Sequence, residues 1–211
     1  MGAVLTFLAG QDALDALAAL ADEAEEGRSA YWQEELENFS VRADGSVSGH
    51  AALGNASAKG STFNKFAHSF LQWPLHRLAQ FPGRTDCIRL GRLIAERQNR
   101  QITFDILRQC FTLALIREHL DLSPAGECNL VIGDGYGVMS ALLLLHAPHR
   151  RTIALNLTKP LLLDLAYVRR AVPDICLALV ANGEEMRAAL ADERIRLIGV
   201  RADDFQSIHE A

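Results

Sequence analysis

The stretch NLVIGDGYG, residues 129–137, is followed directly by the apolar run VMSALLLLH, residues 138–146. A strand-like segment enters a turn that carries glycines at positions 133, 135 and 137, and a helix-like segment leaves the turn. Glycine lets a backbone turn sharply and lets a ligand approach main-chain N–H groups, and the following helix offers its positive N-terminal end. The pattern predicts the strand-to-helix entry of a nucleotide-type site in a doubly wound α/β domain. An ordinary glycine-rich turn is the alternative interpretation.

The glycine spacing distinguishes between classes of nucleotide site. The dinucleotide fingerprint G-x-G-x-x-G needs its third glycine three residues after the second, and that position is Val138. The P-loop needs Gly-Lys-Ser/Thr, which does not follow. The spacing found, G-x-G-x-G from Gly133 to Gly137, resembles motif I of class I S-adenosylmethionine-dependent methyltransferases. A nicotinamide-dependent enzyme is therefore disfavoured, and the resemblance implies S-adenosylmethionine as the cofactor.

The two parts of the chain differ in their hydrophobic pattern. Residues 1–125 are mostly helical in pattern, with a loop rich in Gly, Ser, Ala and Asn over 43–62 and helices expected over 11–26, 29–39, 64–80, 86–97 and 103–120. From residue 126 onward, strand patterns at 128–132, 152–157, 175–180 and 195–200 alternate with helix patterns at 138–146, 161–171 and 184–190. This alternation predicts a parallel sheet with right-handed crossovers. We expect an α/β fold, with a helical N-terminal or cap region, 1–125, and an incomplete Rossmann-like domain, 126–211.

Composition narrows the classes of partner. The chain has 211 residues, 49% of them apolar, and a formal net charge of −5. Residues 11–50 carry ten acidic side chains against two arginines, and residues 51–110 carry nine basic side chains against three acids. We expect these two segments to lie near each other, with attraction of an anionic partner as the alternative. Nucleic acid is not expected, because aromatic residues are not interleaved with the basic ones.

Cysteine usage and hydropathy indicate a cellular location. The four cysteines, Cys87, Cys110, Cys128 and Cys176, form no C-x-x-C pair and lie in apolar contexts, as buried free cysteines do. Neither a zinc site nor a disulfide framework is expected, and no histidine shows metal-ligand spacing. No apolar run approaches the roughly 18 residues of a membrane span. These features predict a cytoplasmic protein without a metal or a membrane partner.

A longer run, VIGDGYGVMSALLLLHAPHRRTIALNLTKPLLLDLAYVRRAVPD over residues 131–174, resembles the core of the sugar O-methyltransferase family, a class I group. The glycine turn and the proline-associated, leucine-rich helix with Tyr167 carry the likeness, and SAYW at 29–32 resembles the family's N-terminal part. The resemblance spans roughly residues 29–208. It implies methyl transfer from S-adenosylmethionine to a hydroxyl of a sugar or sugar-containing acceptor. The residues that it assigns to the cofactor are Gly133, Asp134, Gly135, Tyr136, Gly137 and, facing the ribose, Asn156.

Three departures from the family pattern favour a second hypothesis. Val131 replaces a usual acid before the turn, and Asn156 replaces the acid that normally holds the ribose hydroxyls. Exchanging a charged for a neutral hydrogen-bond acceptor weakens binding by about 1 kcal/mol. Only four strand patterns are present, whereas a complete sheet of this class has seven strands. The alternative is therefore a degenerate, non-catalytic methyltransferase-like protein, or a fragment, that acts as a binding or partner module.

Two further expectations concern the chemistry and the sheet edge. No catalytic base is legible, and Glu184 and Glu185 either contact an adenine or favour the dipole of their own helix. In a complete sheet of this class the first strand lies beside the fourth. Without that neighbour, strand 128–132 becomes an exposed edge next to the cofactor turn, and such an edge invites pairing with another chain. We therefore expect self-association or poor solubility.

Overall fold

The computed structural model describes residues 7–21, 39–44, 46–49, 73–74, 77, 80–122 and 126–210. Almost all of the helix expected over 29–39 and most of the helix expected over 64–80 lie outside the described residues. Much of the acidic segment 11–50 does so too, and its pairing with the basic segment stays a prediction. The C-terminal half of the chain is described almost completely.

A five-stranded sheet forms the centre of the molecule, with the strand order β1-β6-β7-β5-β4. Its four longer strands run parallel to one another: β4 (Cys128–Ile132), β5 (Arg151–Asn156), β6 (Cys176–Val180) and β7 (Ile195–Arg201). The short strand β1 (Leu8–Ala9) pairs antiparallel with β6. The expected α/β class with a mostly parallel sheet is confirmed, and β1 is a strand that the hydrophobic pattern did not indicate.

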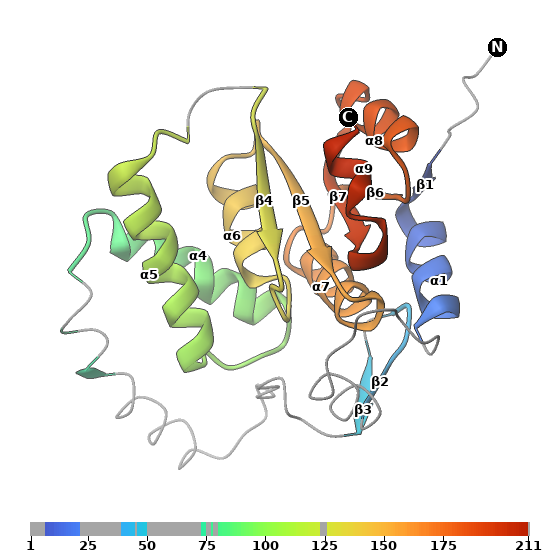
Figure 1. Cartoon of the computed structure of the whole chain (residues 1–211). Coiled ribbons are helices and arrows are strands. Elements are labelled where there is room, and N and C mark those ends of the chain that lie inside the picture. The colour runs from blue at the N-terminus through green and yellow to red at the C-terminus, as the bar shows by residue number, and fades with distance from the viewer. Residues whose placement is uncertain are drawn as a thin grey trace.

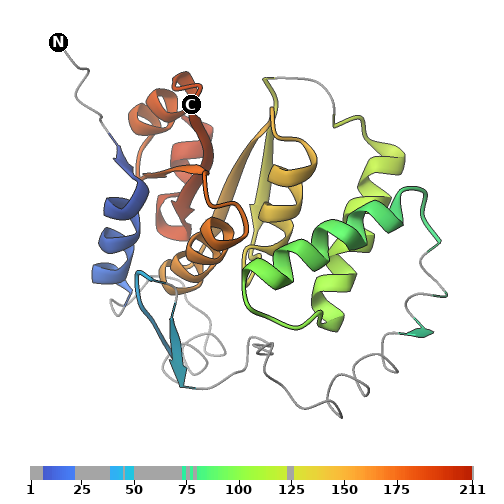
Figure 2. The ribbon, with the colours of Figure 1, turned by 180° about the vertical axis from the view of Figure 1, so that it is seen from behind.

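Helices cover both faces of the sheet, but unevenly (Figures 1 and 2). On one face, α6 (Val138–His146) and α7 (Thr158–Ala171) contact the strands, α4 (Arg84–Arg97) and α5 (Phe104–His119) pack on α6, and α1 (Gly10–Leu20) packs on α7. On the other face, α8 (Gly183–Ala191) contacts β6 and β7, and the short α9 (Gln206–His209) packs on α8. A hairpin of β2 (Phe39–Val41) and β3 (Val47–Gly49) contacts α7 through β2.

The strand order differs from the order expected of a class I sheet. The last strand, β7, lies between β5 and β6 and does not pair with β4. The two common doubly wound orders both place the first strand of the motif inside the sheet. Here β4 pairs only with β5 among the described residues, so it forms an edge, as we expected for the strand of the glycine turn. The architecture is Rossmann-like in its layers, with its own strand order.

One face of the β4 edge is not covered by any element that the structure describes. In Figure 1 no described helix lies in front of β4, whereas α8 and α9 lie over β6 and β7. Leu130 and Ile132 project on this side and are 49% and 69% exposed. Ile153, the cross-strand neighbour of Leu130, is buried against residues of β7 and β6. Leu155, the neighbour of Ile132, packs against the same cluster. The apolar surface of the covered half of the sheet therefore continues onto an open face at β4.

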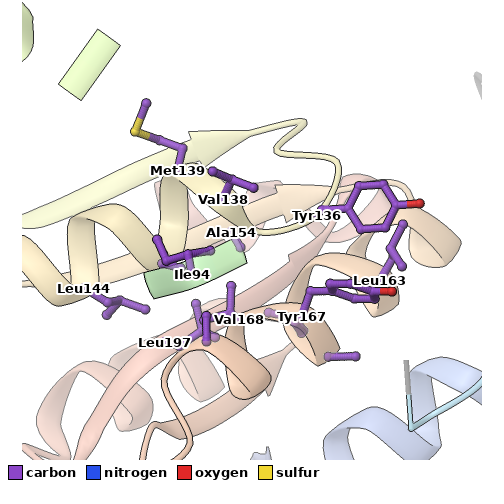
Figure 3. Close-up of a cluster of buried hydrophobic side chains, with 14 of the residues drawn as sticks. Ile94, Tyr136, Val138, Met139, Leu144, Ala154, Leu163, Tyr167, Val168 and Leu197 are labelled. Atoms are coloured by element: carbon purple, nitrogen blue, oxygen red, sulfur yellow. The ribbon is translucent and has the colours of Figure 1, made fainter. Parts of the chain in front are cut away.

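The main hydrophobic core lies between the sheet and helices α6 and α7. Leu161, Leu163, Val168 and Leu197 are fully buried in it, and Figure 3 shows part of this cluster directly beneath the glycine turn. The same core includes buried residues of both parts of the chain, among them Leu14, Ile94, Leu113 and Leu142. The helix α7 is buried over nearly its whole length, because the sheet packs on one side of it and other helices on the other.

Several local expectations are corrected by the structure. Phe39 begins a strand, not the end of a helix, and part of the expected loop 43–62 forms β3. Cys128 and Cys176 are exposed, because both stand at the start of strands, whereas Cys87 and Cys110 are buried between α4 and α5. The helix α7 begins two residues before Pro160, at Thr158.

Candidate functional site

The glycine turn follows β4 at the carboxyl edge of the sheet, where the arrowheads of β4 and β5 point in Figure 1. Gly133 begins the turn and donates its backbone N–H to the carbonyl of Leu155 at 3.1 Å. The φ angles are +70° at Gly133, +87° at Gly135 and +62° at Gly137, in the left-handed region that favours glycine. A Cβ on Gly133 or Gly135 would meet no atom within 4 Å. The first part of the turn therefore presents open space above its backbone.

Gly137 has a different role from the other two glycines. A Cβ there would lie 2.5 Å from the carbonyl oxygen of Asp164 and 2.4 Å from Cγ2 of Val168, both in α7. Because glycine has no Cβ, α7 can pack closely against the start of α6. Gly137 therefore serves the packing of two helices, and it is the buried glycine of the turn.

Asp134 is turned into the protein. Its Oδ1 accepts the backbone N–H of Met139 at 2.9 Å, and its Oδ2 accepts that of Ser140 at 2.7 Å. These are free N–H groups of the first turn of α6, and a carboxylate there also opposes the positive helix end. Burial raises the pKa of Asp134, while the bonds from Ser140 and Met139 act in the opposite direction. The end of α6 thus already holds an anion that belongs to the protein.

A second buried carboxylate, Asp164 of α7, connects the turn to the end of β5. It accepts the backbone N–H of Gly137 at 3.2 Å and the side-chain amide of Asn156 at 2.9 Å. Asn156 also accepts the N–H of Leu157 at 2.9 Å, so both ends of its amide have a protein partner. Burial, and then the negative charge of Asp134, raise the pKa of Asp164 well above its usual value. Because Asp134 accepts two N–H groups at the positive end of a helix, we take Asp134 as the ionised member of this buried pair and Asp164 as the protonated one.

Tyr136 lies in a buried aromatic cluster. Its ring meets Tyr167 edge to face, with centroids 4.9 Å apart (Figure 3), and the guanidinium carbon of Arg100 lies 3.9 Å from its centroid. Gln98 donates its side-chain amide to the carbonyls of Tyr136 and Tyr167, each at 3.1 Å. Burial raises the pKa of Tyr136 to about 12. Tyr136, like Asp134 and Gly137, is therefore buried and contacts other residues of the protein.

A crevice is expected where neighbouring strands continue to opposite faces of a sheet. β5 leads into α7, which packs in the main core, whereas β7 leads through the 3₁₀ turn Ala202–Asp204 to α9, whose Ile208 packs in the core of the other face. Asn156 and Arg201 are paired in register at the carboxyl ends of these strands. The switch in connection therefore lies beside Asn156.

Arg201 and Asp204 are polar residues of this crevice that our sequence reasoning missed. The guanidinium of Arg201 donates to both carboxylate oxygens of Asp204, at 2.7 and 3.1 Å. The two side chains are 24% and 15% exposed. The available signal was the acidic pair that directly follows the last strand pattern, at positions 203 and 204.

Glu185 stands at the start of α8, as the sequence suggested, and it caps a turn. Its carboxylate accepts the N–H of Ala181 at 2.7 Å, and its own N–H donates to Asn182, the N-cap residue, at 3.0 Å. These bonds favour the interpretation in terms of the helix end. Within the described part of the chain, no group of three or more His, Cys, Asp or Glu residues is arranged to hold a metal. No described helix combines the length and apolar character needed to cross a membrane.

Comparisons with protein-family models, with curated proteins and with solved structures give no match to this chain. The residues expected at the cofactor site can therefore be compared only by their exposure in the structure. Gly133 and Gly135 are accessible and Asn156 is half-buried at the sheet edge, whereas Asp134, Tyr136 and Gly137 are buried.

Proposed function

We propose that the glycine turn binds S-adenosylmethionine and that the protein transfers its methyl group to a hydroxyl of a sugar or sugar-containing small molecule. The observation that carries the proposal is the open backbone of Gly133 and Gly135 beside Asn156, at the carboxyl edge of a parallel sheet. This edge is where ligands of such sheets bind. The free cysteines and the absence of a membrane-length helix among the described residues are compatible with a cytoplasmic enzyme.

The inward position of Asp134 favours this cofactor over a dinucleotide. A diphosphate bound at the N-terminus of α6 would compete with the carboxylate that already accepts the N–H groups of Met139 and Ser140. A sulfonium cofactor carries a positive charge at its reacting centre and no phosphate, so it avoids this repulsion. The charge of Asp134 therefore disfavours a dinucleotide in addition to the glycine spacing.

In this proposal, different residues of the site bind different parts of the cofactor. Main-chain groups at Gly133 and Gly135 contact the cofactor where a side chain would exclude it. Asn156 faces the ribose and keeps one N–H and one lone pair beyond its bonds to Asp164 and Leu157. Methyl transfer then depends on holding the acceptor oxygen in line with the methyl carbon that the cofactor supplies.

Calorimetry with S-adenosylhomocysteine tests the site. We expect weak binding by the wild type and none by Gly135→Val, because a branched side chain fills the space above the turn. Gly126→Val is the matched control, since Gly126 also has φ +87° and a Cβ there would also meet no atom within 4 Å, but it precedes β4 at the other end of that strand. Equal binding by Gly135→Val and Gly126→Val would refute the proposal.

A second candidate function is a non-catalytic binding or partner module. It is favoured by the bonds that occupy Asn156 and by the uncovered apolar face of the β4 edge strand. An assay for transfer of a labelled methyl group to a panel of saccharides separates the two candidates. Cofactor binding without transfer to any saccharide would favour the module, and saturable transfer would exclude it.

A further inference from the structure

A cavity of about 370 Å³ opens at the carboxyl ends of β6 and β7, between these strands and α1. This volume falls in the range of small-molecule sites. Its apolar wall includes Phe7, Leu20 and Leu179, and its polar residues are Glu185, Arg201 and Asp204. Arg201 is also the register partner of Asn156, so the cavity adjoins the crevice between β5 and β7.

The polar residues of the cavity are held in place by the fold. Arg201 and Asp204 form a two-point ion pair, and one oxygen of Glu185 is anchored by the N–H of Ala181. Side chains held by such bonds lose little further freedom when a ligand binds. The cavity therefore combines a fixed polar side with an apolar side, which is the general form of a small-molecule site.

We infer that this cavity binds a neutral ring with neighbouring hydroxyl groups. Carboxylates accept hydrogen bonds from hydroxyl groups and the guanidinium donates to them, so the three polar residues suit adjacent hydroxyls. The wall at Phe7, Leu20 and Leu179 suits the C–H face of such a ring. Arg201 and Asp204 cancel each other's charge, which leaves the negative charge of Glu185 and disfavours an anion. The inference deepens the proposed function, on which the role of this cavity as the acceptor site rests.

Titration with methyl α-D-glucopyranoside, followed by NMR on the labelled chain, tests the inference. We expect saturable shifts at Ala181 and Arg201 with a dissociation constant on the order of 1 mM, as the modest binding energy per atom of small ligands implies. Ala16 of α1 lines the cavity, and Ala16→Phe should abolish these shifts. Ala19→Phe places the same side chain on an exposed position of the same helix and should not.

A substitution that keeps the volume tests the polar side. Asp204→Asn should weaken binding at least about fivefold, because a neutral acceptor replaces a charged one. Asp192→Asn is its control, since Asp192 forms a similar two-point pair with Arg194 away from this cavity. Tetrahydropyran-2-methanol, a ring with one hydroxyl, should bind more weakly than the glucoside. Absence of saturable binding, equal binding of the two rings, or binding unchanged in both Ala16→Phe and Asp204→Asn would overturn the inference.

The test of the cavity can fail independently of the test of the cofactor site. Gly135→Val should leave binding of the glucoside unchanged, because Gly135 does not line the cavity. Binding of S-adenosylhomocysteine without binding of the glucoside would remove only the inference about the cavity. Binding of the glucoside alone would leave the cavity and remove the cofactor site.

Discussion

At the scale of single residues, the glycines of the turn share a left-handed backbone but differ in their surroundings. Gly133 and Gly135 open toward solvent, whereas Gly137 packs against α7. The same difference separates the two polar residues of the turn region. Asn156 reaches the surface, whereas Asp134 holds the end of α6 from inside. Stability and ligand binding should therefore respond to different positions of one short turn.

Alanine substitutions should reveal this division. Gly133→Ala carries the cost of a left-handed alanine, roughly 1 to 2 kcal/mol. Gly137→Ala adds contacts of 2.4 and 2.5 Å with α7, so its free energy of unfolding should fall by roughly 3 kcal/mol or more. Urea denaturation measures both. Equal losses in the two variants would show that the close packing of α7 on the turn is wrong.

The buried carboxyl of Asp164 should make stability depend on pH. Its raised pKa means that the folded protein keeps a proton that the unfolded chain releases near its ordinary value of 3.8. The free energy of unfolding should therefore decrease as the pH rises from about 4 toward the raised pKa, by at most about 1.4 kcal/mol per pH unit for one proton. Below the ordinary value, this contribution is fully present.

Denaturation of the wild type and Asp164→Asn between about pH 4 and pH 8 checks this prediction. The substituted side chain cannot ionise, so the free energy of unfolding of the variant should change less with pH over this interval. Its stability should be lower at every pH, because the amide cannot replace both bonds of the carboxyl. Asp174→Asn, at an exposed position, should follow the wild type. Parallel pH profiles for the wild type and Asp164→Asn would contradict the assignment of the proton.

The sequence could predict the turn but not the direction of its side chains. Positive φ angles favour glycine for local steric reasons, so the spacing at positions 133, 135 and 137 was informative by itself. The contacts of Gly137 and Asn156 come from Asp164 of α7, 27 and 8 positions further along the chain. Such contacts depend on how helices pack, and a local pattern does not contain them.

At the scale of elements, the contact between α4 and α5 depends on a single glycine. A Cβ on Gly91 would lie 2.3 Å from Sγ of Cys110. Alanine normally stabilises a helix interior by about 1 kcal/mol relative to glycine. Here we expect Gly91→Ala to lower the free energy of unfolding by roughly 1 to 2 kcal/mol, because the helices must separate. Thermal or urea denaturation gives this value.

A double variant provides the control for this contact. Cys110→Ala removes the sulfur that Gly91→Ala would meet, at the cost of a small cavity. The double variant should be more stable than the sum of the two single losses predicts, because the clash is absent. Strictly additive losses would show that the two helices do not approach each other at this point.

Element positions were predictable because their signals are local. The four strands expected from residue 126 onward agree with β4, β5, β6 and β7 to within about one residue, and Asn182 caps α8 as its side chain allows. The two-residue strand β1 had no detectable pattern, since it is defined by its pairing with β6. The strand that begins at Phe39 was likewise missed, because it is defined by its pairing with the strand that ends at Gly49.

At the scale of the whole molecule, the uncovered β4 edge should cause self-association. The strand carries no charged residue between Cys128 and Ile132, and charges are a common protection of strand edges. We expect light scattering during size exclusion to show a mass that rises with concentration. Ile132→Lys should reduce this association, whereas Leu120→Lys, at a residue 61% exposed but outside the sheet, should not.

A mass that does not rise with concentration would contradict this prediction. A monodisperse monomer at high concentration would show that the edge and its apolar face are covered in solution. The position of β4 at an edge was expected because its usual neighbour, the fourth strand of such a sheet, was taken to be missing. The insertion of the fourth long strand, β7, between β5 and β6 was not expected. Strand order follows from which face each crossover helix covers, and the hydrophobic pattern is nearly the same for either face.

We propose that the open glycines and Asn156 form a site that binds S-adenosylmethionine and excludes dinucleotides. The decisive measurement is an NMR titration of the labelled chain with S-adenosylhomocysteine and, separately, with NAD. We predict that S-adenosylhomocysteine shifts the amide signals of Gly133, Gly135 and Asn156 and leaves Gly126 unchanged, and that NAD produces no saturable shift. Shifts confined to other regions, or tighter binding of NAD at the same glycines, would contradict the claim.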